Sequence, residues 1–206
     1  MKLNMIRTPP NGTPSPAAIG RPRKPETQSH ILRAAADILV EEGFRALKME
    51  RVSMRAGVGK TTVYRRWKSV PELVIDLLEH ANEAWPMPQT DSESITEALS
   101  QLYRNWICGM SGPGKIIPVL IAEGIQNPSL AELLHDRFVL PRRRLAIAII
   151  EKAKVRGDVS SDVDNEAAID MFMGRMWYRH LVTGGRITID DEGKVIELLV
   201  RGLRGK

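Results

Sequence analysis

Apolar residues recur along most of the chain at the spacing of amphipathic helices, with breaks rich in glycine and proline between the segments. The first strong pattern spans residues 27–43, and Gly43 is placed to end that helix. Its apolar face consists of Ile31, Ala35, Ile38 and Leu39. Alternation that would suit a strand is confined to residues 186–189. The pattern therefore predicts an all-α fold.

Residues 49–67 read as two short helices joined by a tight turn. Gly57 falls between them, where a glycine can adopt the positive φ that lets a chain leave a helix sharply. Ser53 is small at the position where the second helix must cross the first. Each helix has an apolar pair four residues apart, Val52 with Ala56 and Val63 with Trp67. This arrangement is that of a helix-turn-helix, whose second helix enters the DNA major groove.

The outer face of the second helix carries hydroxyls and cations, which bind phosphate oxygens, and an arginine can bind the guanine edge with two hydrogen bonds. The expected DNA contacts are Lys60, Thr61, Thr62, Tyr64, Arg65, Arg66 and Lys68. We expect Tyr64 to contact phosphate, because its hydroxyl lies at the end of a long rigid side chain. A solvated basic helix is the plainer alternative, but the turn glycine, apolar spacing and basic face agree on DNA. Residues 59–61 also match the end of a phosphate-binding loop, yet Met54 stands where that motif requires glycine.

The rest of the chain is predicted to form further helices. The first of them begins at a capping box, Ser69 to Glu72, and ends before Trp85. A long segment from Asn127 to about Arg156 is expected to be kinked or broken at Pro141. The remaining predicted helices start near Ser94, Gly112, Asp164 and Asp191, and the last two end at Val182 and Leu203.

Charge is divided unevenly along the 206 residues, whose formal net charge is +5. Residues 1–69 carry 14 Lys and Arg against 5 Asp and Glu, whereas residues 70–206 carry 16 against 20. A basic N-terminal part on an acidic body indicates a polyanion bound at one end.

The first 25 residues hold six of the 13 prolines and lack apolar periodicity, so we expect a disordered arm. Its end, residues 20–25, is basic and resembles half of an AT-hook, in which Arg21 and Arg23 would lie along an A·T minor groove. A merely solubilising tail is an equal alternative, because Ile19 stands where the hook has a further arginine.

Little in the sequence favours catalysis, a metal or a membrane. The four histidines are scattered, and neither a cysteine cluster nor a zinc-binding histidine motif occurs, so we expect no enzymatic activity, cofactor or metal. The single cysteine, Cys108, excludes an intramolecular disulfide, suits a reducing cytosol and is expected to be a small buried apolar residue. No apolar run has the length of a signal peptide or membrane span, so a cytoplasmic protein is expected.

The head of the chain resembles the TetR family of tetracycline-repressor-like transcriptional regulators, most strongly over residues 27–79. The segments that fall at the family's spacing are Gly43-Phe44, Ala56-Gly57-Val58, the run from Thr62 to Trp67, and Glu72-Leu73. Weaker similarity continues at residues 153–158, at 162–164 and in the helix of Trp177.

This resemblance implies a helix-turn-helix DNA-binding domain at residues 26–69, after the arm at 1–25, and a helical ligand-binding and dimerisation domain at 70–206. It implies a ligand-responsive repressor that reads a palindromic double-stranded DNA operator as a homodimer. It further implies that a small molecule in the body shifts the helix at about 70–84 and so changes the spacing of the two heads.

Large apolar and aromatic residues on the body helices are candidates for lining a pocket: Tyr103, Trp106, Met110, Leu120, Phe138, Met173 and Trp177. Core packing is at least as good an interpretation of each, and their apolar character favours a hydrophobic effector. Wide apolar stripes on the last two long helices are candidates for a four-helix dimer interface: Ile169, Phe172, Met176, Val195, Leu198 and Leu199.

Two other functions stay open at this point. A non-specific DNA-coating or architectural protein would account for the basic head, but it would not need an acidic helical body. A regulator gated by a partner protein rather than by a small molecule would have the same bundle, and the sequence does not separate these two.

Overall fold

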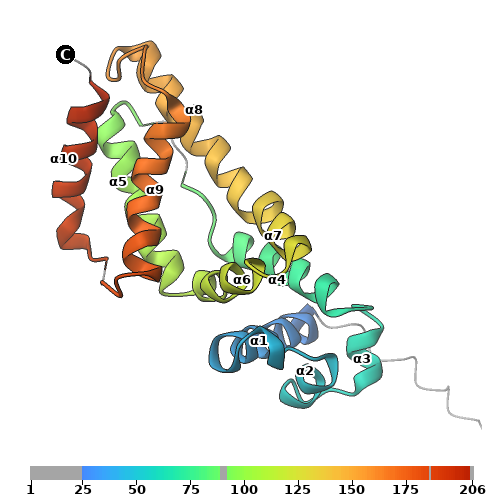
Figure 1. Cartoon of the computed structure of the whole chain (residues 1–206). Coiled ribbons are helices and arrows are strands. Elements are labelled where there is room, and N and C mark those ends of the chain that lie inside the picture. Colours follow the sequence, from blue (N-terminus) through green and yellow to red (C-terminus); the bar gives the residue numbers. More distant parts are fainter. Residues whose placement is uncertain (1–24, 89–91, 186, 205–206) are drawn as a thin grey trace, which may run out of the picture.

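The computed structural model describes residues 25–88, 92–185 and 187–204, which fold into helices joined by turns (Figure 1). The head consists of α1 (Pro25–Glu42), η1 (Phe44–Ala46), α2 (Met49–Arg55) and α3 (Lys60–Tyr64). The body consists of α4 (Val70–Ala84), α5 (Ile95–Met110), η2 (Pro113–Ile116), α6 (Ile117–Gly124), α7 (Pro128–Leu134), the π-helical η3 (His135–Val139), α8 (Leu140–Arg156), α9 (Asn165–Leu181), η4 (Ile189–Asp191) and α10 (Glu192–Leu203). The prediction of an all-α fold is confirmed.

The one candidate strand, at residues 186–189, is not formed. No residue in the described part of the chain belongs to a strand, and Arg186 itself lies outside that part. Thr188 leads instead into η4, and its carbonyl accepts a hydrogen bond of 3.0 Å from the Tyr103 hydroxyl. Because the helical body offers no strand to pair with, contacts with neighbouring helices determine the conformation of this short segment.

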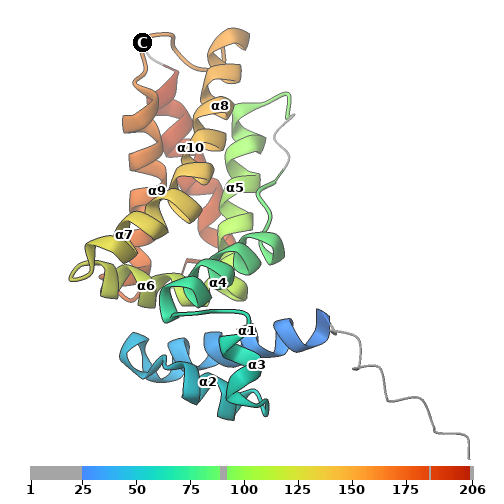
Figure 2. The ribbon, with the colours of Figure 1, turned by 90° about the vertical axis from the view of Figure 1, so that its right-hand side faces the viewer.

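The head is compact, the body is elongated, and α4 lies between them (Figures 1 and 2). The long helices α5, α8, α9 and α10 run side by side away from the head (Figure 2). In the body, α5 packs against α10 and α8, and α8 packs against α9. The head rests on the body through α1, which contacts α4 and η2, and through η1, which contacts α6.

Side-chain caps explain where several body helices begin. The Ser69 hydroxyl accepts a hydrogen bond from the Glu72 N–H at 3.4 Å, as the predicted capping box requires. Asn127 and Asp164 cap α7 and α9 in the same way, at 3.2 Å and 2.7 Å. Ser94 occupies the N-cap of α5 as predicted, but its side chain makes no capping hydrogen bond.

The segment from Asn127 to Arg156 is interrupted by η3 rather than by a simple kink at Pro141. Pro141 lies in the first turn of α8, where a missing N–H is tolerated. A proline at this position cannot donate to the carbonyl of Arg137, four residues earlier. That carbonyl accepts a hydrogen bond of 2.8 Å from the Asn82 side chain, so the interruption ties α8 to α4.

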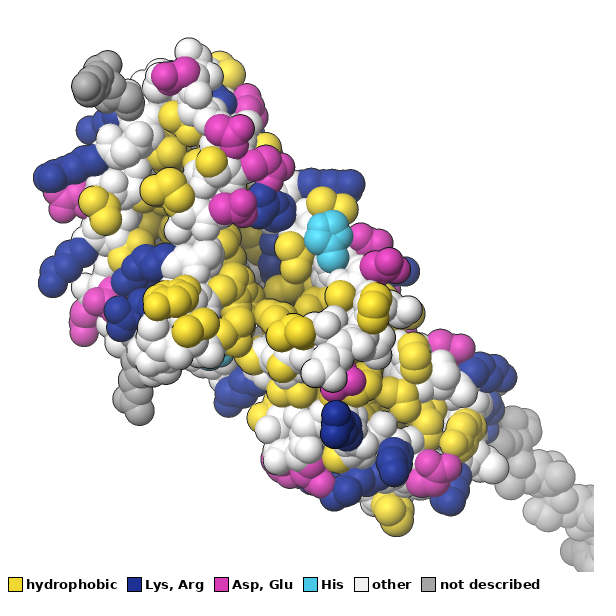
Figure 3. Space-filling view, viewed as in Figure 1, with side chains coloured by type: hydrophobic (Ala, Val, Ile, Leu, Met, Phe, Trp, Pro, Cys, Tyr) yellow, Lys and Arg dark blue, Asp and Glu magenta, His cyan; other side chains and the backbone are white. Residues whose placement is uncertain are grey.

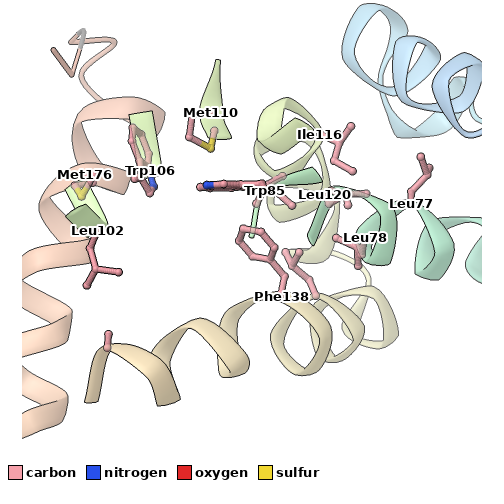
Figure 4. Close-up of a cluster of buried hydrophobic side chains, with 14 of the residues drawn as sticks. Leu77, Leu78, Trp85, Leu102, Trp106, Met110, Ile116, Leu120, Phe138 and Met176 are labelled. Carbon is pink, nitrogen blue, oxygen red and sulfur yellow. The ribbon is translucent and has the colours of Figure 1, made fainter. Parts of the chain in front are cut away.

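The core runs continuously from the head into the body, and α4 contributes to both parts. Leu73 and Val74 in its first half, and Leu77 and Leu78 after them, are buried. The first half of α4 is also held to the head, since the indole N–H of Trp67 donates to Asp76 at 2.8 Å. Figure 4 shows Leu77 and Leu78 at one end of a buried cluster that continues through the body.

Candidate nucleic-acid interface and ligand pocket

The turn between α2 and α3 is built on Gly57, whose φ is +64°. The Val58 N–H donates to the Ser53 carbonyl at 3.0 Å and closes the end of α2. Ser53 is buried, and its hydroxyl donates to the Glu50 carbonyl at 2.7 Å. Val63 of α3 is fully buried, so the opposite face of this short helix is the one that meets solvent.

Most of the predicted DNA contacts lie on that exposed face. Lys60, Thr61, Tyr64, Arg65 and Lys68 are exposed, whereas Thr62 and Arg66 are half-buried. Arg66 donates to the Gln28 side chain of α1 at 2.7 Å, so its guanidinium braces the head. Arg21 and Arg23 lie outside the described residues.

Ion pairing divides the cations of the head into two groups. Arg51 and Arg55 pair with carboxylates at the end of α1, on Glu42 and on Glu41. Among the residues that the structure describes, no carboxylate forms an ion pair with the exposed cations of α3 and the segment after it, Lys60, Arg65 and Lys68. The exposed cations on the α3 side of the head are therefore available to a polyanion.

The Tyr64 hydroxyl donates to Glu50 Oε1 at 2.9 Å. This hydrogen bond raises the pKa of Tyr64, and the backbone N–H of Glu50 together with Tyr64 lowers the pKa of Glu50. Because the hydroxyl has one proton, donation to a phosphate would replace the bond to Glu50. The positive charges of Lys60 and of Lys48, the N-cap residue of α2, lower the pKa of Glu50 further. Lys48 is exposed and was not among the predicted DNA contacts, although it stands just before α2 in the sequence.

A cavity of about 490 Å³ opens between α5, α6, α8 and α9, within the size range of small-molecule sites. Where this face of the body is hollowed, Figure 3 shows hydrophobic side chains. Four aromatic residues line the cavity: Trp85, Trp106, Phe138 and Trp177. The Trp106 and Trp177 rings meet edge to face, with centroids 5.6 Å apart. Trp85 and Phe138, shown together in Figure 4, have centroids 5.7 Å apart.

Arg142 also lines the cavity, and no carboxylate of the described chain pairs with it. Its Nη1 donates to Asn82 Oδ1 at 2.6 Å, and its Nη2 donates to the Trp85 carbonyl at 3.2 Å. Its Cζ lies 3.9 Å from the centroid of the Phe138 ring, a cation–π contact. Burial lowers the pKa of Arg142 to about 10, because desolvation disfavours the charged form.

The structure separates the seven predicted pocket residues into two sets. Trp106, Phe138, Met173 and Trp177 line the cavity. Tyr103, Met110 and Leu120 do not, and all three are buried in the core of the body. Trp85 and Arg142 also line the cavity but were not predicted. In the sequence Trp85 marks a helix end, and Arg142 is one of three consecutive arginines.

The residues predicted for dimerisation also fall into two sets. Ile169, Phe172 and Met176 of α9 are buried within the protomer. On α10, Leu198 is 76% exposed, and Val195 and Leu199 are half-buried. A second hollow of about 510 Å³ lies between α9 and α10, and the exposed Met171 and Leu198 both line it. The exposed apolar side of α9 therefore includes Met171 and Tyr178 and is not the predicted one.

Cys108 is exposed, so its expected burial is wrong. The buried positions of α5 include Leu102, Trp106 and Gly109, and this helical stripe leaves position 108 on the polar side. Within the described ranges no three His, Cys, Asp or Glu side chains gather as a metal site would require. Among the described helices, none combines the length and the hydropathy needed to cross a membrane.

Two family models match the chain. The model described as "Bacterial regulatory proteins, tetR family" matches residues 31–77, which hold the helix-turn-helix. The model described as "Tetracyclin repressor-like, C-terminal domain" matches residues 89–199, which form most of the body.

Individual proteins give the same result. The uncharacterized HTH-type transcriptional regulator YdeS of Bacillus subtilis (strain 168) is 33% identical over 187 residues, which are 90% of this chain and 92% of the relative. The crystal structure of the TetR family transcription regulator SCO0332 is 27% identical, has a TM-score of 0.65, and covers 86% of this chain and 98% of its own. The flavonoid-responsive regulator FrrA shares the fold, with 22% identity, a TM-score of 0.66, and coverage of 86% and 94%.

Proposed function

Since the chain belongs to the TetR family of helix-turn-helix transcriptional regulators, we propose that it is a ligand-responsive repressor that binds a palindromic operator as a homodimer. The observation that carries the proposal is the pairing of two features in one molecule. Unpaired cations lie on the α3 face of the head, and an aromatic cavity lies in the body, with α4 between them.

DNA is read by the exposed face of α3. Its exposed polar residues are Lys60, Thr61 and Tyr64, and the exposed Arg65 and Lys68 follow directly after it. Cations and hydroxyls at these positions bind phosphates and fix the register, and Arg65 is the side chain suited to a guanine edge. A two-fold dimer would space its two recognition helices about one DNA turn apart, roughly 34–36 Å, which favours a palindromic site.

Dimerisation uses α9 and α10, which expose apolar side chains next to each other. Met171 and Tyr178 of α9 and Leu198 of α10 are exposed large hydrophobic residues. Pairing this surface with its copy across a two-fold axis forms a four-helix interface and removes the apolar side chains from water. The proposed interface thus includes Val195, Leu198 and Leu199 of α10, as expected from the sequence, together with Met171 of α9.

The helix α4 couples the cavity to the head. Its Asp76 is hydrogen-bonded to Trp67 of the head, and its Asn82 to Arg142 and to the Arg137 carbonyl of the cavity side. A ligand that prefers the DNA-incompetent position of α4 shifts the population toward it. A coupling free energy of about 1–3 kcal/mol would change DNA affinity about 5–150-fold.

Selection of binding sites from a random duplex pool tests the DNA part of the proposal. We expect an enriched palindrome whose half-sites are about one helical turn apart, and weaker binding to a scrambled duplex at the same salt concentration. Equal affinity for the selected and scrambled duplexes would support a DNA-coating protein instead.

A thermal-shift screen of small-molecule libraries tests the ligand part, because a ligand that binds the folded state raises the melting temperature. Gly174→Phe provides a blocked cavity, since Gly174 lines it and an added Cβ meets nothing within 4 Å. Gly193→Phe is the matched control, because Gly193 has equal space but lies on α10 away from the cavity. We expect hits that lose their shift in the first variant alone; a library without hits would favour gating by a partner protein.

A further inference from the structure

Within the described residues, Arg142 has more hydrogen-bond donors than acceptors to receive them. A guanidinium carries five N–H donors. Nη1 donates to Asn82 Oδ1 and, at 3.4 Å, to the Phe138 carbonyl, while Nη2 donates once, to the Trp85 carbonyl. Nε is buried and has no acceptor among the described residues. Among the described residues Nε therefore donates to no acceptor and Nη2 to one, which leaves unused donor capacity on these two nitrogens.

The same two nitrogens of another arginine in this protein hold a carboxylate. Arg104 donates from Nε to Glu192 Oε2 at 2.9 Å and from Nη2 to Glu192 Oε1 at 2.6 Å. The spacing of these two nitrogens matches the two oxygens of a carboxylate, which makes such pairs strong and directional. Arg142 has the same two nitrogens, and its side chain lines a cavity where the described chain supplies no carboxylate.

The other polar groups of the cavity wall are mostly satisfied. Arg143 pairs with Asp170 and Glu166, and the Asn105 side chain accepts from Trp85 and donates to the Pro86 carbonyl. Besides Arg142 Nε, the buried wall atom without a partner in the described structure is the indole N–H of Trp106. Both unmatched groups are donors, so a complementary ligand supplies acceptor oxygens.

The remaining wall is apolar. Trp177, Met173 and Ile121 line it together with the tryptophan and phenylalanine rings already described. A buried cation without a counter-charge is costly, and an occupant that brings an anion relieves that cost while its apolar part covers the rings.

We propose that the effector is an amphipathic acid, with an aromatic or aliphatic body against the tryptophans and a carboxylate held by the Nε and Nη2 edge of Arg142. This inference rests on the proposed ligand-responsive function and adds the chemical class of the ligand. Arg142 also donates to the carbonyl of Trp85, the C-cap of α4. A carboxylate bound to Arg142 would therefore act on the group that holds the C-terminal end of α4 to α8.

Competition with a neutral dye tests the inference on the full-length protein. The apolar dye N-phenyl-1-naphthylamine is bound first, and 2-naphthoate and its uncharged isostere 2-naphthamide are compared as displacers at pH 7. We expect the carboxylate to displace the dye at a concentration at least about tenfold lower than the amide, the size of one charge-assisted interaction. Dye binding is expected to be lost in Gly174→Phe and kept in Gly193→Phe, which assigns it to the cavity.

Three arginine variants identify the group that recognises the anion. In Arg142→Gln the ratio of the two displacing concentrations should fall to about one, with the dye still bound. In Arg142→Lys, which keeps the charge but not the paired donors, the ratio should be intermediate. In the control Arg143→Gln the ratio should be unchanged, because the lost cation was already paired.

The possible failures are distinguishable. A ratio near one in the unmodified protein overturns the acidic-ligand inference and leaves the proposed ligand-responsive function standing. A full ratio in a folded Arg142→Gln protein overturns the assignment to Arg142. Absence of dye binding, or binding that Gly174→Phe does not affect, overturns both. If Arg142→Gln does not fold, the ratios in the unmodified protein and in Arg142→Lys decide the question.

Discussion

At the scale of single residues, the turn that orients α3 depends on one backbone angle. Gly57 has a φ of +64°, a region that costs an L-residue about 1–2 kcal/mol. Gly59 lies in the same turn with an ordinary φ of −66°. We predict that Gly57→Ala lowers the free energy of unfolding by about 1–2 kcal/mol, whereas Gly59→Ala changes it by less than about 0.5 kcal/mol. Urea denaturation of both variants measures this difference, and equal losses would show that strain at Gly57 is unimportant.

A second prediction at this scale concerns the two groups of head cations. Arg65→Ala should weaken operator binding and reduce the slope of log K against log salt concentration by about 1, since one phosphate contact is lost. Arg51→Ala is the control, because Arg51 is already paired with Glu42. Fluorescence anisotropy at several salt concentrations measures both slopes. Equal slopes for Arg65→Ala and the unmodified protein would remove Arg65 from the interface.

The sequence pattern predicted which side chains of α3 face solvent better than it predicted which residues line the cavity. On a short helix anchored by Val63, periodicity alone determines which side chains face outward, and the cations there need no partner to be recognised. Arg142 gives no such signal, because its environment is created by Asn82, Trp85 and Phe138 from two other segments. Its burial follows from packing, which a local pattern does not contain.

At the scale of helices, α10 is attached to α5 by the Arg104–Glu192 ion pair. Glu192 is 7% exposed, and the hydrogen bonds from Arg104 hold the pKa of its carboxyl below the ordinary value of 4.5. The folded-state pKa is the lower one, so the pair stabilises the fold above about pH 4.5 and that contribution is lost as the pH falls further.

We therefore predict that Glu192→Gln lowers the free energy of unfolding at pH 7 by about 1–2 kcal/mol, the lower part of the range for charged hydrogen bonds because Arg104 is half exposed. The deficit should shrink below pH 4. Glu197→Gln, which removes an exposed partner of Arg201 on the same helix, should cost less than about 0.5 kcal/mol. Urea titrations at pH 7 and pH 3.5 measure both variants, and an undiminished deficit at the lower pH would contradict the ion-pair explanation.

The end of α4 fits into a notch on α5 that requires a glycine. A Cβ at Gly109 would lie 1.8 Å from Cε2 of the Trp85 indole, too close for either group to remain in place. We predict that Gly109→Ala displaces Trp85 and lowers stability by about 1–3 kcal/mol. Near-ultraviolet circular dichroism and thermal denaturation measure the two effects. Gly193→Ala, which meets nothing within 4 Å, is the control and should leave both signals unchanged.

The order of the helices follows from the sequence, but the character of one break does not. Proline at position 141 indicates an irregularity, and a kink is its commonest result. The chain forms the π-helical η3 instead, and the Arg137 carbonyl accepts a hydrogen bond from the Asn82 side chain of α4. The choice depends on a partner 55 positions away in the sequence, so no local pattern could have specified it.

At the scale of the whole molecule, the proposed homodimer depends on the apolar surface of α9 and α10. We predict that Leu198→Arg yields a folded monomer with strongly reduced operator affinity, because the charge would be buried in the dimer interface. Val155→Arg is the matched control, since Val155 is 89% exposed, belongs to α8 and does not line the hollow between α9 and α10. Sedimentation velocity at micromolar concentration distinguishes the two, and a Leu198→Arg dimer would move the interface elsewhere.

The all-helical architecture and its basic head follow from periodicity and charge, whereas the position of the cavity does not. Tyr103 and Trp106 are one helical turn apart on α5 and look alike in a hydrophobic pattern. The first is in the core, with its hydroxyl donating to the Thr188 carbonyl, and the second faces the cavity. Whether a large side chain fills space or borders it is decided by the helices opposite, which are remote in the sequence.

The double attachment of α4 has a consequence for how such proteins can be recombined. Trp67 bonds to Asp76, and Leu73 and Val74 complete the apolar interior beneath α1, so a fragment ending at residue 69 would leave part of its own interior uncovered. A transplanted DNA-binding module would therefore include α4, which ends at Ala84. It would then carry Asn82, the residue that hydrogen-bonds to Arg142 and to the Arg137 carbonyl in the body. Under the proposed mechanism, exchanging DNA specificity between such regulators would thus also exchange part of the coupling helix.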